Sequence, residues 1–243
     1  MINKITRELV STYKVIVGAI VSLRNDRVKK VDSKEIVYLD LGLHTDAEQL
    51  RSVVQWFGHI DKFRAFGFEA NPAHFSKVAD QEWPLCVSLV NMALVGPDHD
   101  GDTIDFYVES NGKGLGDSIF KEKSRSYEFD KITVPCGKLS DFFKQNSIDL
   151  ASQKVLLRMN IEGAELFVLQ DMASNGLIKL IDGFYGSWSD CAKISKSYGE
   201  ALAELKTANQ ISNIQFNRSE FRGFLSAVRR SLVKAHMAMI LKS

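Results

Sequence analysis

The sequence has few of the features that mark a nucleic-acid-binding or disulfide-stabilised protein. Its formal net charge at pH 7 is only +1, so the total charge gives no strong attraction to nucleic acid. Its three cysteines, at positions 86, 136 and 191, are odd in number and far apart. They show neither a disulfide framework nor the spacing of a metal site, which favours a reducing compartment. We therefore expect a cytoplasmic protein that binds neither nucleic acid nor a metal.

Long apolar runs and glycine-rich phosphate loops are also missing. The apolar run near the N-terminus, residues 15–23, is shorter than the roughly 20 residues that span a bilayer. It has no convincing small-residue cleavage site, so we do not expect a signal peptide. The chain has no G-x-G-x-x-G run, which is the signature of dinucleotide binding. This absence disfavours an NAD-dependent dehydrogenase built on a similar sheet.

What is present is the pattern of one large α/β domain. The chain has 243 residues, of which 45% are hydrophobic and 25% charged, and this length can bury a sizeable core. Apolar runs alternate with amphipathic segments, which predicts a doubly wound, mostly parallel sheet. The predicted strands are residues 36–41, 63–68, 85–94, 103–108, 132–136, 155–161, 180–185 and 211–216. The predicted helices are residues 46–57, 72–79, 139–144 and 192–205, and one that follows 162–165 and reaches about residue 172.

Further segments flank or interrupt this pattern. The turn at 97–101 separates two strand-like runs and predicts a β-hairpin insertion. Apolar residues at helical spacing predict terminal helices over 1–24 and 220–241. The expected domains are an N-terminal helix and linker over 1–34, a central domain over 35–216, and an amphipathic helix within 217–243 packed on it. Because this last helix has basic residues on its polar side, peripheral membrane contact is the alternative to packing.

The stretch over residues 36–46 organises the rest of the chain. An apolar strand runs into Asp40 and Gly42, and an amphipathic helix follows; the second strand then ends in the acid Glu69. Ligands of such sheets bind beyond the carboxyl ends of the strands. An acid after the second strand suits the two hydroxyls of a ribose. The order of strand, turn, helix, strand and acid therefore predicts a nucleotide-binding sheet.

Four motifs in this order resemble the FkbM-type S-adenosylmethionine-dependent methyltransferases. They are DLG at 40–42, FEANP at 68–72, VNMAL at 90–94 and NIEGAE at 160–165. The resemblance covers about residues 36–190 and implies the Rossmann-like sheet of a class I methyltransferase. It also implies the cofactor S-adenosyl-L-methionine and O-methylation of a hydroxyl on a carbohydrate or a similar small molecule.

The resemblance assigns most of the candidate residues to the cofactor. They are Asp40, Gly42, His44, Glu69, Ala70, Asn91, Met92, Ser118 and Asn160. Gly42 would let the turn approach the methionyl group, and Asp40 would hydrogen-bond near the methionyl ammonium. Glu69 would accept hydrogen bonds from the ribose hydroxyls, since a carboxylate accepts two at once. Asn91 and Met92 would lie near the adenine.

Two positions differ from the usual pattern of the family. The first turn usually ends in glycine, where this chain has Asp46, and the block before EGAE usually has aspartate, where this chain has Asn160. Asp46 could cap the helix that follows. Asn160 can orient a ligand but cannot act as a base. A non-catalytic binding or scaffold protein with the same fold is therefore the alternative function.

Methyl transfer to a hydroxyl needs a group that takes up the proton. Glu162, at the carboxyl end of a predicted strand, is the first candidate, and Asp190 after the next strand is the second. Glu162 could instead be a charge at a helix N-terminus, and Glu165 a capping partner. Trp188 could stack on a sugar ring or pack in the core. The expected partner is a small-molecule or glycan acceptor.

Overall fold

The structure, a computed structural model, describes residues 34–110, 116–121, 128–216 and 224–242. The chain forms two units, Glu35–Ile214 and a second one made of Met1–Lys34 and Gln215–Ser243. The first unit contains the predicted methyltransferase sheet. The predicted N-terminal helix, residues 1–24, lies outside the described residues.

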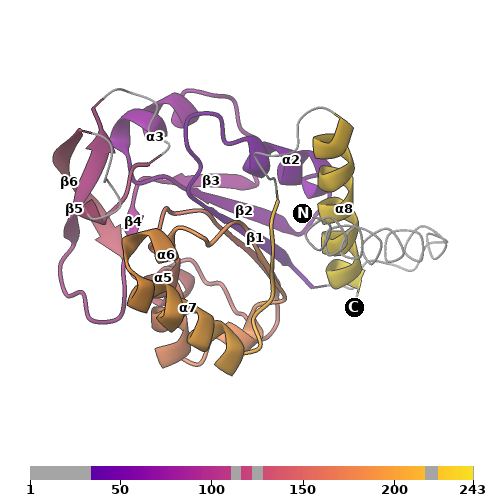
Figure 1. The fold of residues 1–243 in the computed structure, drawn as a ribbon. Helices are drawn as coiled ribbons and strands as arrows, with labels where there is room; N and C mark the ends of the chain where they lie inside the picture. The colour runs from indigo at the N-terminus through magenta and orange to yellow at the C-terminus, as the bar shows by residue number, and fades with distance from the viewer. Residues whose placement is uncertain (1–33, 111–115, 122–127, 217–223, 243) are drawn as a thin grey trace. The chain divides into compact units, whose positions relative to one another are not determined.

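A six-stranded sheet forms the centre of the first unit (Figure 1). Its strands are β1 (Ile36–Leu41), β2 (Phe63–Phe68), β3 (Val87–Val90), β7 (Lys154–Met159), β8 (Gly183–Tyr185) and β9 (Asn213–Ile214). Their order is β3-β2-β1-β7-β8-β9, and all neighbouring strands are parallel. The predicted mostly parallel α/β sheet is therefore confirmed, and β1 lies in its interior, with all six of its residues buried.

Helices connect the strands and cover both faces of this sheet. They are α2 (Glu48–Phe57), α3 (Pro72–Ala79), α4 (Leu139–Gln145), α5 (Glu165–Ser174), α6 (Cys191–Ile194) and α7 (Lys196–Ala208), with a 3-10 turn, η2 (Ile178–Leu180). On one face, Val37 and Leu39 of β1 share a core with Phe142 of α4 and Leu169 of α5. On the other face, a Cβ atom at Gly67 would lie 2.7 Å from Leu50 of α2.

A second, three-stranded sheet corrects one part of the sequence prediction. The run 85–94 is not one strand, because β3 belongs to the central sheet and β4 (Ala93–Leu94) to the small one. The strand β5 (Thr103–Glu109) pairs antiparallel with β6 (Phe129–Gly137), and β4 pairs parallel with the other edge of β6. The hairpin-like insertion is therefore made by β5 and β6, since the turn at 97–101 carries the chain away from β4 to the far edge of β6.

The second unit contains the predicted C-terminal helix as α8 (Phe224–Lys242). Nε of Arg229 in this helix donates a hydrogen bond to the carbonyl of Gln215 at 2.9 Å. None of the helices in the described part of the chain combines the length and the apolar character needed to cross a bilayer. The packing of this helix on the central domain stays a prediction.

Candidate active site

The carboxyl ends of β1, β2 and β7 meet at one edge of the central sheet. Here the amide of Gly42 donates to the carbonyl of Phe68 at 3.0 Å, and the amide of Asn160 donates to the carbonyl of Leu41 at 2.9 Å. Gly42 has a φ of 91°, and a Cβ atom at this position would lie 2.1 Å from the carbonyl oxygen of Asn160. Only glycine permits so close an approach of two strand ends in this conformation.

A cavity of about 120 Å³ lies at this edge. The predicted cofactor residues that line it are Gly42, His44, Glu69, Ala70, Met92 and Asn160. Glu162, the first candidate for the proton acceptor, lines the same cavity, and so do Phe106 of β5 and Ile119. The fold therefore brings together residues from the ends of β1, β2, β3 and β7, as parallel strands require.

Glu69 is held at the end of β2 by two backbone amides. Its Oε2 accepts a hydrogen bond from the amide of His44 at 2.7 Å, and its Oε1 accepts one from the amide of Asn71 at 2.9 Å. The residue is only 7% exposed. Burial raises the pKa of the Glu69 carboxyl, and the two amides oppose that shift because they stabilise the carboxylate. The carboxylate thus joins the turn after β1 to the start of α3.

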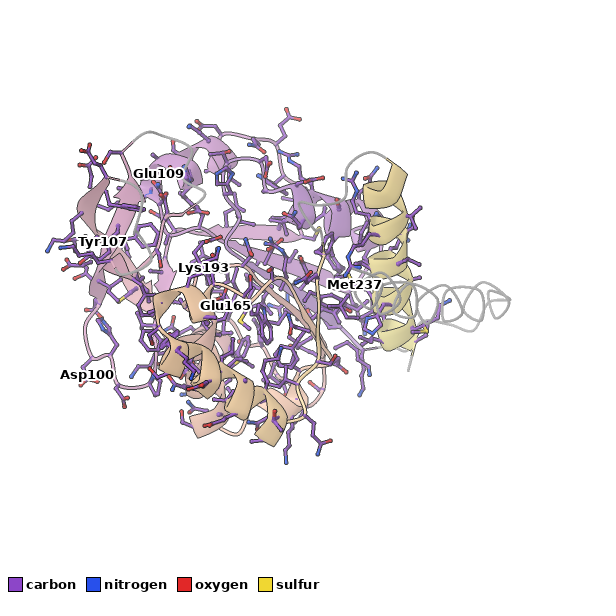
Figure 2. All side chains as sticks on the ribbon, viewed as in Figure 1. Asp100, Tyr107, Glu109, Glu165, Lys193 and Met237 are labelled. Carbon is purple, nitrogen blue, oxygen red and sulfur yellow. The ribbon has the colours of Figure 1, made fainter. Side chains whose placement is uncertain are left out.

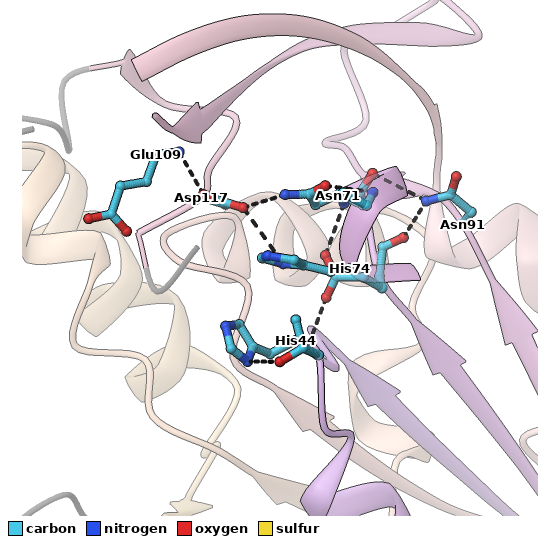
Figure 3. A network of polar contacts seen from close by, with 10 residues as sticks. His44, Asn71, His74, Asn91, Glu109 and Asp117 are labelled. Atoms are coloured by element: carbon cyan, nitrogen blue, oxygen red, sulfur yellow. Dashed lines mark hydrogen bonds and ion pairs between the residues drawn. The ribbon is translucent and has the colours of Figure 1, made fainter. Parts of the chain in front are cut away.

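A second polar cluster surrounds Asp117, which also lines the cavity (Figure 3). Its Oδ2 accepts a hydrogen bond from the side-chain amide of Asn71 at 2.6 Å and lies 3.7 Å from Nδ1 of His74. Its Oδ1 accepts one from the amide of Glu109 at 2.9 Å. The rings of His74 and His44 meet edge to face, with centroids 4.9 Å apart. Burial lowers the pKa of His74, and Asp117 opposes this shift.

Two of the predicted cofactor residues support the walls of the cavity instead of lining it. The side-chain amide of Asn91 donates to the carbonyl of Glu69 at 2.7 Å and to that of Ala70 at 3.2 Å. The hydroxyl of Ser118 donates to the carbonyl of Glu162 at 2.9 Å. Both side chains thereby fix backbone that carries cavity-lining residues.

Asp40 lies inside the sheet and does not line the cavity. It faces Arg158 across the β1–β7 register, and Nη1 of Arg158 donates to its Oδ1. The hydroxyl of Tyr38 donates to Oδ2 at 3.2 Å, and Nη1 of Arg158 also reaches the carbonyl of Gly42 at 3.2 Å. Burial raises the pKa of Asp40, and Arg158 opposes the shift. The carboxylate of Asp40 is therefore paired with the buried guanidinium of Arg158.

Glu162 occupies a strained turn between β7 and α5. Its φ is 57°, a left-handed conformation that is uncommon outside glycine, and Gly163 follows with a φ of 111°. The buried carboxylate of Glu165 holds this turn, because it accepts hydrogen bonds from the amides of Ile161 and Gly163, each at 2.9 Å. Glu165, which is labelled in Figure 2, is the first residue of α5. It therefore holds the backbone on both sides of Glu162, whereas the N-cap residue of this helix is Ala164.

The second candidate proton acceptor, Asp190, lies away from the cavity lining. It precedes α6, and its Oδ1 forms an ion pair with Nζ of Lys193 at 2.8 Å. Trp188 is 4% exposed and packs edge to face on Phe184, with centroids 5.9 Å apart, so it belongs to the core. Asp46 accepts a hydrogen bond from the amide of Glu48 at 3.3 Å, but the N-cap residue of α2 is Ala47 and no side chain caps this helix, so the capping role considered for Asp46 is not observed.

Two residues of this region, His74 and Arg158, were not assigned a function from the sequence. His74 comes two residues after the FEANP motif and five after Glu69, and this closeness is the only signal that could have pointed to it. Arg158 could be linked to Asp40 only through the register of two strands 118 positions apart. The part of the chain that the structure describes contains no group of three or more His, Cys, Asp or Glu side chains placed to hold a metal ion.

A larger hollow of about 510 Å³ lies beside β6 and α4. Its lining includes His99, Cys136 and Lys138, and Nε2 of His99 lies 3.2 Å from Sγ of Cys136. Burial raises the pKa of the Cys136 thiol, which disfavours the reactive thiolate. Of the predicted site residues, only Met92 borders this hollow. The chemistry expected from the sequence therefore lies in the smaller cavity.

One of the comparisons with known proteins identifies a family. The methyltransferase FkbM domain matches residues 42–184, which is more than half of the chain and contains every residue named above as lining the smaller cavity. No curated protein and no solved structure matches the chain. The match begins at the glycine of the first turn and ends in β8. The chain therefore belongs to the family of FkbM methyltransferases.

Proposed function

We propose that the protein transfers a methyl group from S-adenosyl-L-methionine to a hydroxyl of a carbohydrate or a similar small molecule. The observation that carries the proposal is the position of Glu69. Its carboxylate lines the cavity at the end of β2, beside the Gly42 turn, in a chain that belongs to a methyltransferase family. In nucleotide-binding sheets of this kind, an acid after the second strand commonly binds the ribose hydroxyls.

The residues around the cavity fit this cofactor. Glu69 uses two of its roughly four acceptor positions on backbone amides, which leaves acceptors for the two ribose hydroxyls. Gly42 presents backbone without a side chain to the methionyl end. The cavity volume of about 120 Å³ is below the roughly 300–1,000 Å³ of ligand pockets. We therefore expect lining side chains to move apart when the cofactor binds.

The cofactor supplies an electrophilic methyl group on a positively charged sulfur. The protein must orient the acceptor hydroxyl and receive its proton. Glu162 is the residue that we assign to this role, because it lines the cavity and its backbone is fixed by Glu165 and Ser118. Asp190 is less suited, since it is paired with Lys193 and does not line the cavity.

Isothermal titration calorimetry with S-adenosyl-L-methionine tests the cofactor, with NAD as the comparison ligand. We expect micromolar affinity for the first and no measurable binding of the second. Release of S-adenosyl-L-homocysteine in the presence of methyl glycosides of glucose, galactose and rhamnose then tests the acceptor class. Binding of NAD without binding of S-adenosyl-L-methionine would refute the proposal. Cofactor binding with methylation only of a nitrogen or thiol acceptor would refute its hydroxyl-specific part.

A further inference from the structure

Two histidines face each other in the wall of the cavity. His44 comes from the turn after β1 and His74 from the first turns of α3, and both line the cavity. Their rings meet at an interplanar angle of 62° with centroids 4.9 Å apart (Figure 3). Two imidazoles this close repel each other when both are protonated.

The remaining charge in the lining is negative. Its ionisable side chains besides the two histidines are Glu69, Asp117 and Glu162. Among the described residues that line the cavity, none is a lysine or an arginine. With both imidazoles neutral, the lining therefore attracts a positive charge. Each proton taken up by the pair adds a positive charge to the same wall.

We propose that the His44–His74 pair determines how strongly this site prefers a positively charged sulfur over a neutral one. The inference rests on the proposed function, in which S-adenosyl-L-methionine is the cofactor and S-adenosyl-L-homocysteine the product. These two ligands share the adenosine and the amino-acid end. They differ in the methyl group and in the positive charge on sulfur. With neutral histidines the site favours the cofactor, and protonation of the pair removes that preference.

The surroundings of His74 favour its neutral form. Burial lowers the pKa of His74, and the charges of His44 and Lys77 lower it further, while Asp117 opposes them. The amide of His44 is bound to Glu69, whose own pKa is raised by burial. Glu69 is thus a second group whose protonation would make the wall less negative in acid, and an experiment must separate it from the histidines.

The test is calorimetric affinity for the two ligands between about pH 7.5 and about pH 4.5, a range that extends well below the ordinary pKa of histidine because the pKa of His74 is lowered. We expect the affinity for S-adenosyl-L-methionine, relative to that for S-adenosyl-L-homocysteine, to fall by about tenfold over this range, the effect of one added charge at short distance in a partly buried site. The ratio isolates the charge on sulfur because all shared groups cancel.

Three variants assign the effect. His74→Gln keeps a donor for Asp117, and His44→Asn suits the left-handed backbone at this position, where φ is 59°. Either variant should flatten the pH dependence of the ratio. His59→Gln is the control, because His59 is exposed and does not line the cavity, and it should retain the full dependence. If His74→Gln does not fold, His44→Asn alone decides.

The outcomes separate this inference from the proposed function. A ratio that stays constant with pH, while both ligands bind, overturns the role of the histidines and leaves the methyltransferase proposal intact. A ratio that falls equally in the wild type and in both cavity variants also overturns it and assigns the effect to Glu69. Failure of both ligands to bind at every pH overturns the proposed function and the inference together.

Discussion

Replacing Glu69 with glutamine tests the ribose-binding role most directly. The carboxylate now accepts hydrogen bonds from the amides of His44 and Asn71. In Glu69→Gln the side-chain carbonyl can satisfy one of these donors, while the NH₂ group faces the other. One buried donor left without an acceptor costs about 1–3 kcal/mol of folding stability. Alanine would leave both donors unsatisfied, so glutamine is the milder change.

The expected loss in cofactor affinity follows from the charge of the acceptor. Hydrogen bonds to a charged group contribute about 1.5–3 kcal/mol, which corresponds to roughly a 10- to 150-fold weaker binding of S-adenosyl-L-methionine. Calorimetry measures this loss, and thermal unfolding of the same samples shows that the variant is folded. Asp105→Asn is the matched control, since Asp105 is an exposed acid on β5 that pairs with Lys131. It makes the same chemical change away from the cavity.

A folded Glu69→Gln protein whose affinity stays within about twofold of the wild type would show that the ribose is not bound by this carboxylate. Equal losses in Glu69→Gln and Asp105→Asn would also contradict the reasoning, because they would point to the overall charge of the protein. The expected pattern is a large loss in the first variant and none in the second.

Three further predictions concern the surroundings of the site. Arg158→Met should cost about 3–5 kcal/mol of stability in chemical denaturation, because it leaves Asp40 buried without its partner; Asp40→Asn in the same protein should recover part of the loss, and no recovery would contradict the ion-pair account. Asp46→Gly should not weaken the binding of S-adenosyl-L-methionine, since Asp46 accepts its hydrogen bond from the amide of Glu48 and is not among the residues that line the cavity; a clear loss of affinity in a folded variant would show that it contributes to binding. Removal of residues 220–243 should lower thermal stability or cause aggregation if α8 packs on the domain; a monodisperse, equally stable protein that no longer sediments with anionic vesicles would favour membrane contact instead.

Much of the central sheet could be predicted because its signals are local. The strands 36–41 and 63–68 and the helix 72–79 have the bounds expected from the sequence. Each apolar run ends at a polar turn, and Asn71 accepts a hydrogen bond from the amide of Ala73 as a helix cap. Such signals do not depend on what the segment packs against, so strands, turns and helix caps of this kind can be recognised from the sequence alone.

The small sheet could not be predicted because its pairing is not local. The run 85–94 looks like one strand, but Asn91 turns its side chain onto the backbone of Glu69 and Ala70, and the chain changes sheets there. The partner of β5 is β6, whose first half falls in a segment dominated by charged residues. Asp130 and Lys131 in this half are both exposed, although consecutive residues of a strand point to opposite faces, so the pattern lacks the alternation of a half-buried strand and resembles a loop.

In the candidate site, too, the residues placed by local sequence could be predicted and those placed by non-local packing could not. Glu69 and Gly42 could be placed at the cavity because the carboxyl ends of parallel strands meet at one edge. His74 could not, since its position depends on how α3 packs against Asp117. The pairing of Asp40 with Arg158 depends on the register between β1 and β7, which no local pattern reveals.

The burial of Asp40 changes which residues can recognise the positive charges of the cofactor. The family resemblance places this acid near the methionyl ammonium, but here its charge is compensated by Arg158 within the sheet. The carboxylates that face the cavity are those of Glu69, Asp117 and Glu162. Glu69 is engaged by backbone amides, and Asp117 by Asn71 and Glu109. These hydrogen bonds already compensate part of the negative charge of the two carboxylates. The positive charge added by protonation of His44 and His74 is therefore large relative to the negative charge that remains in the lining. We expect pH to act on the binding of the proposed cofactor through these two histidines.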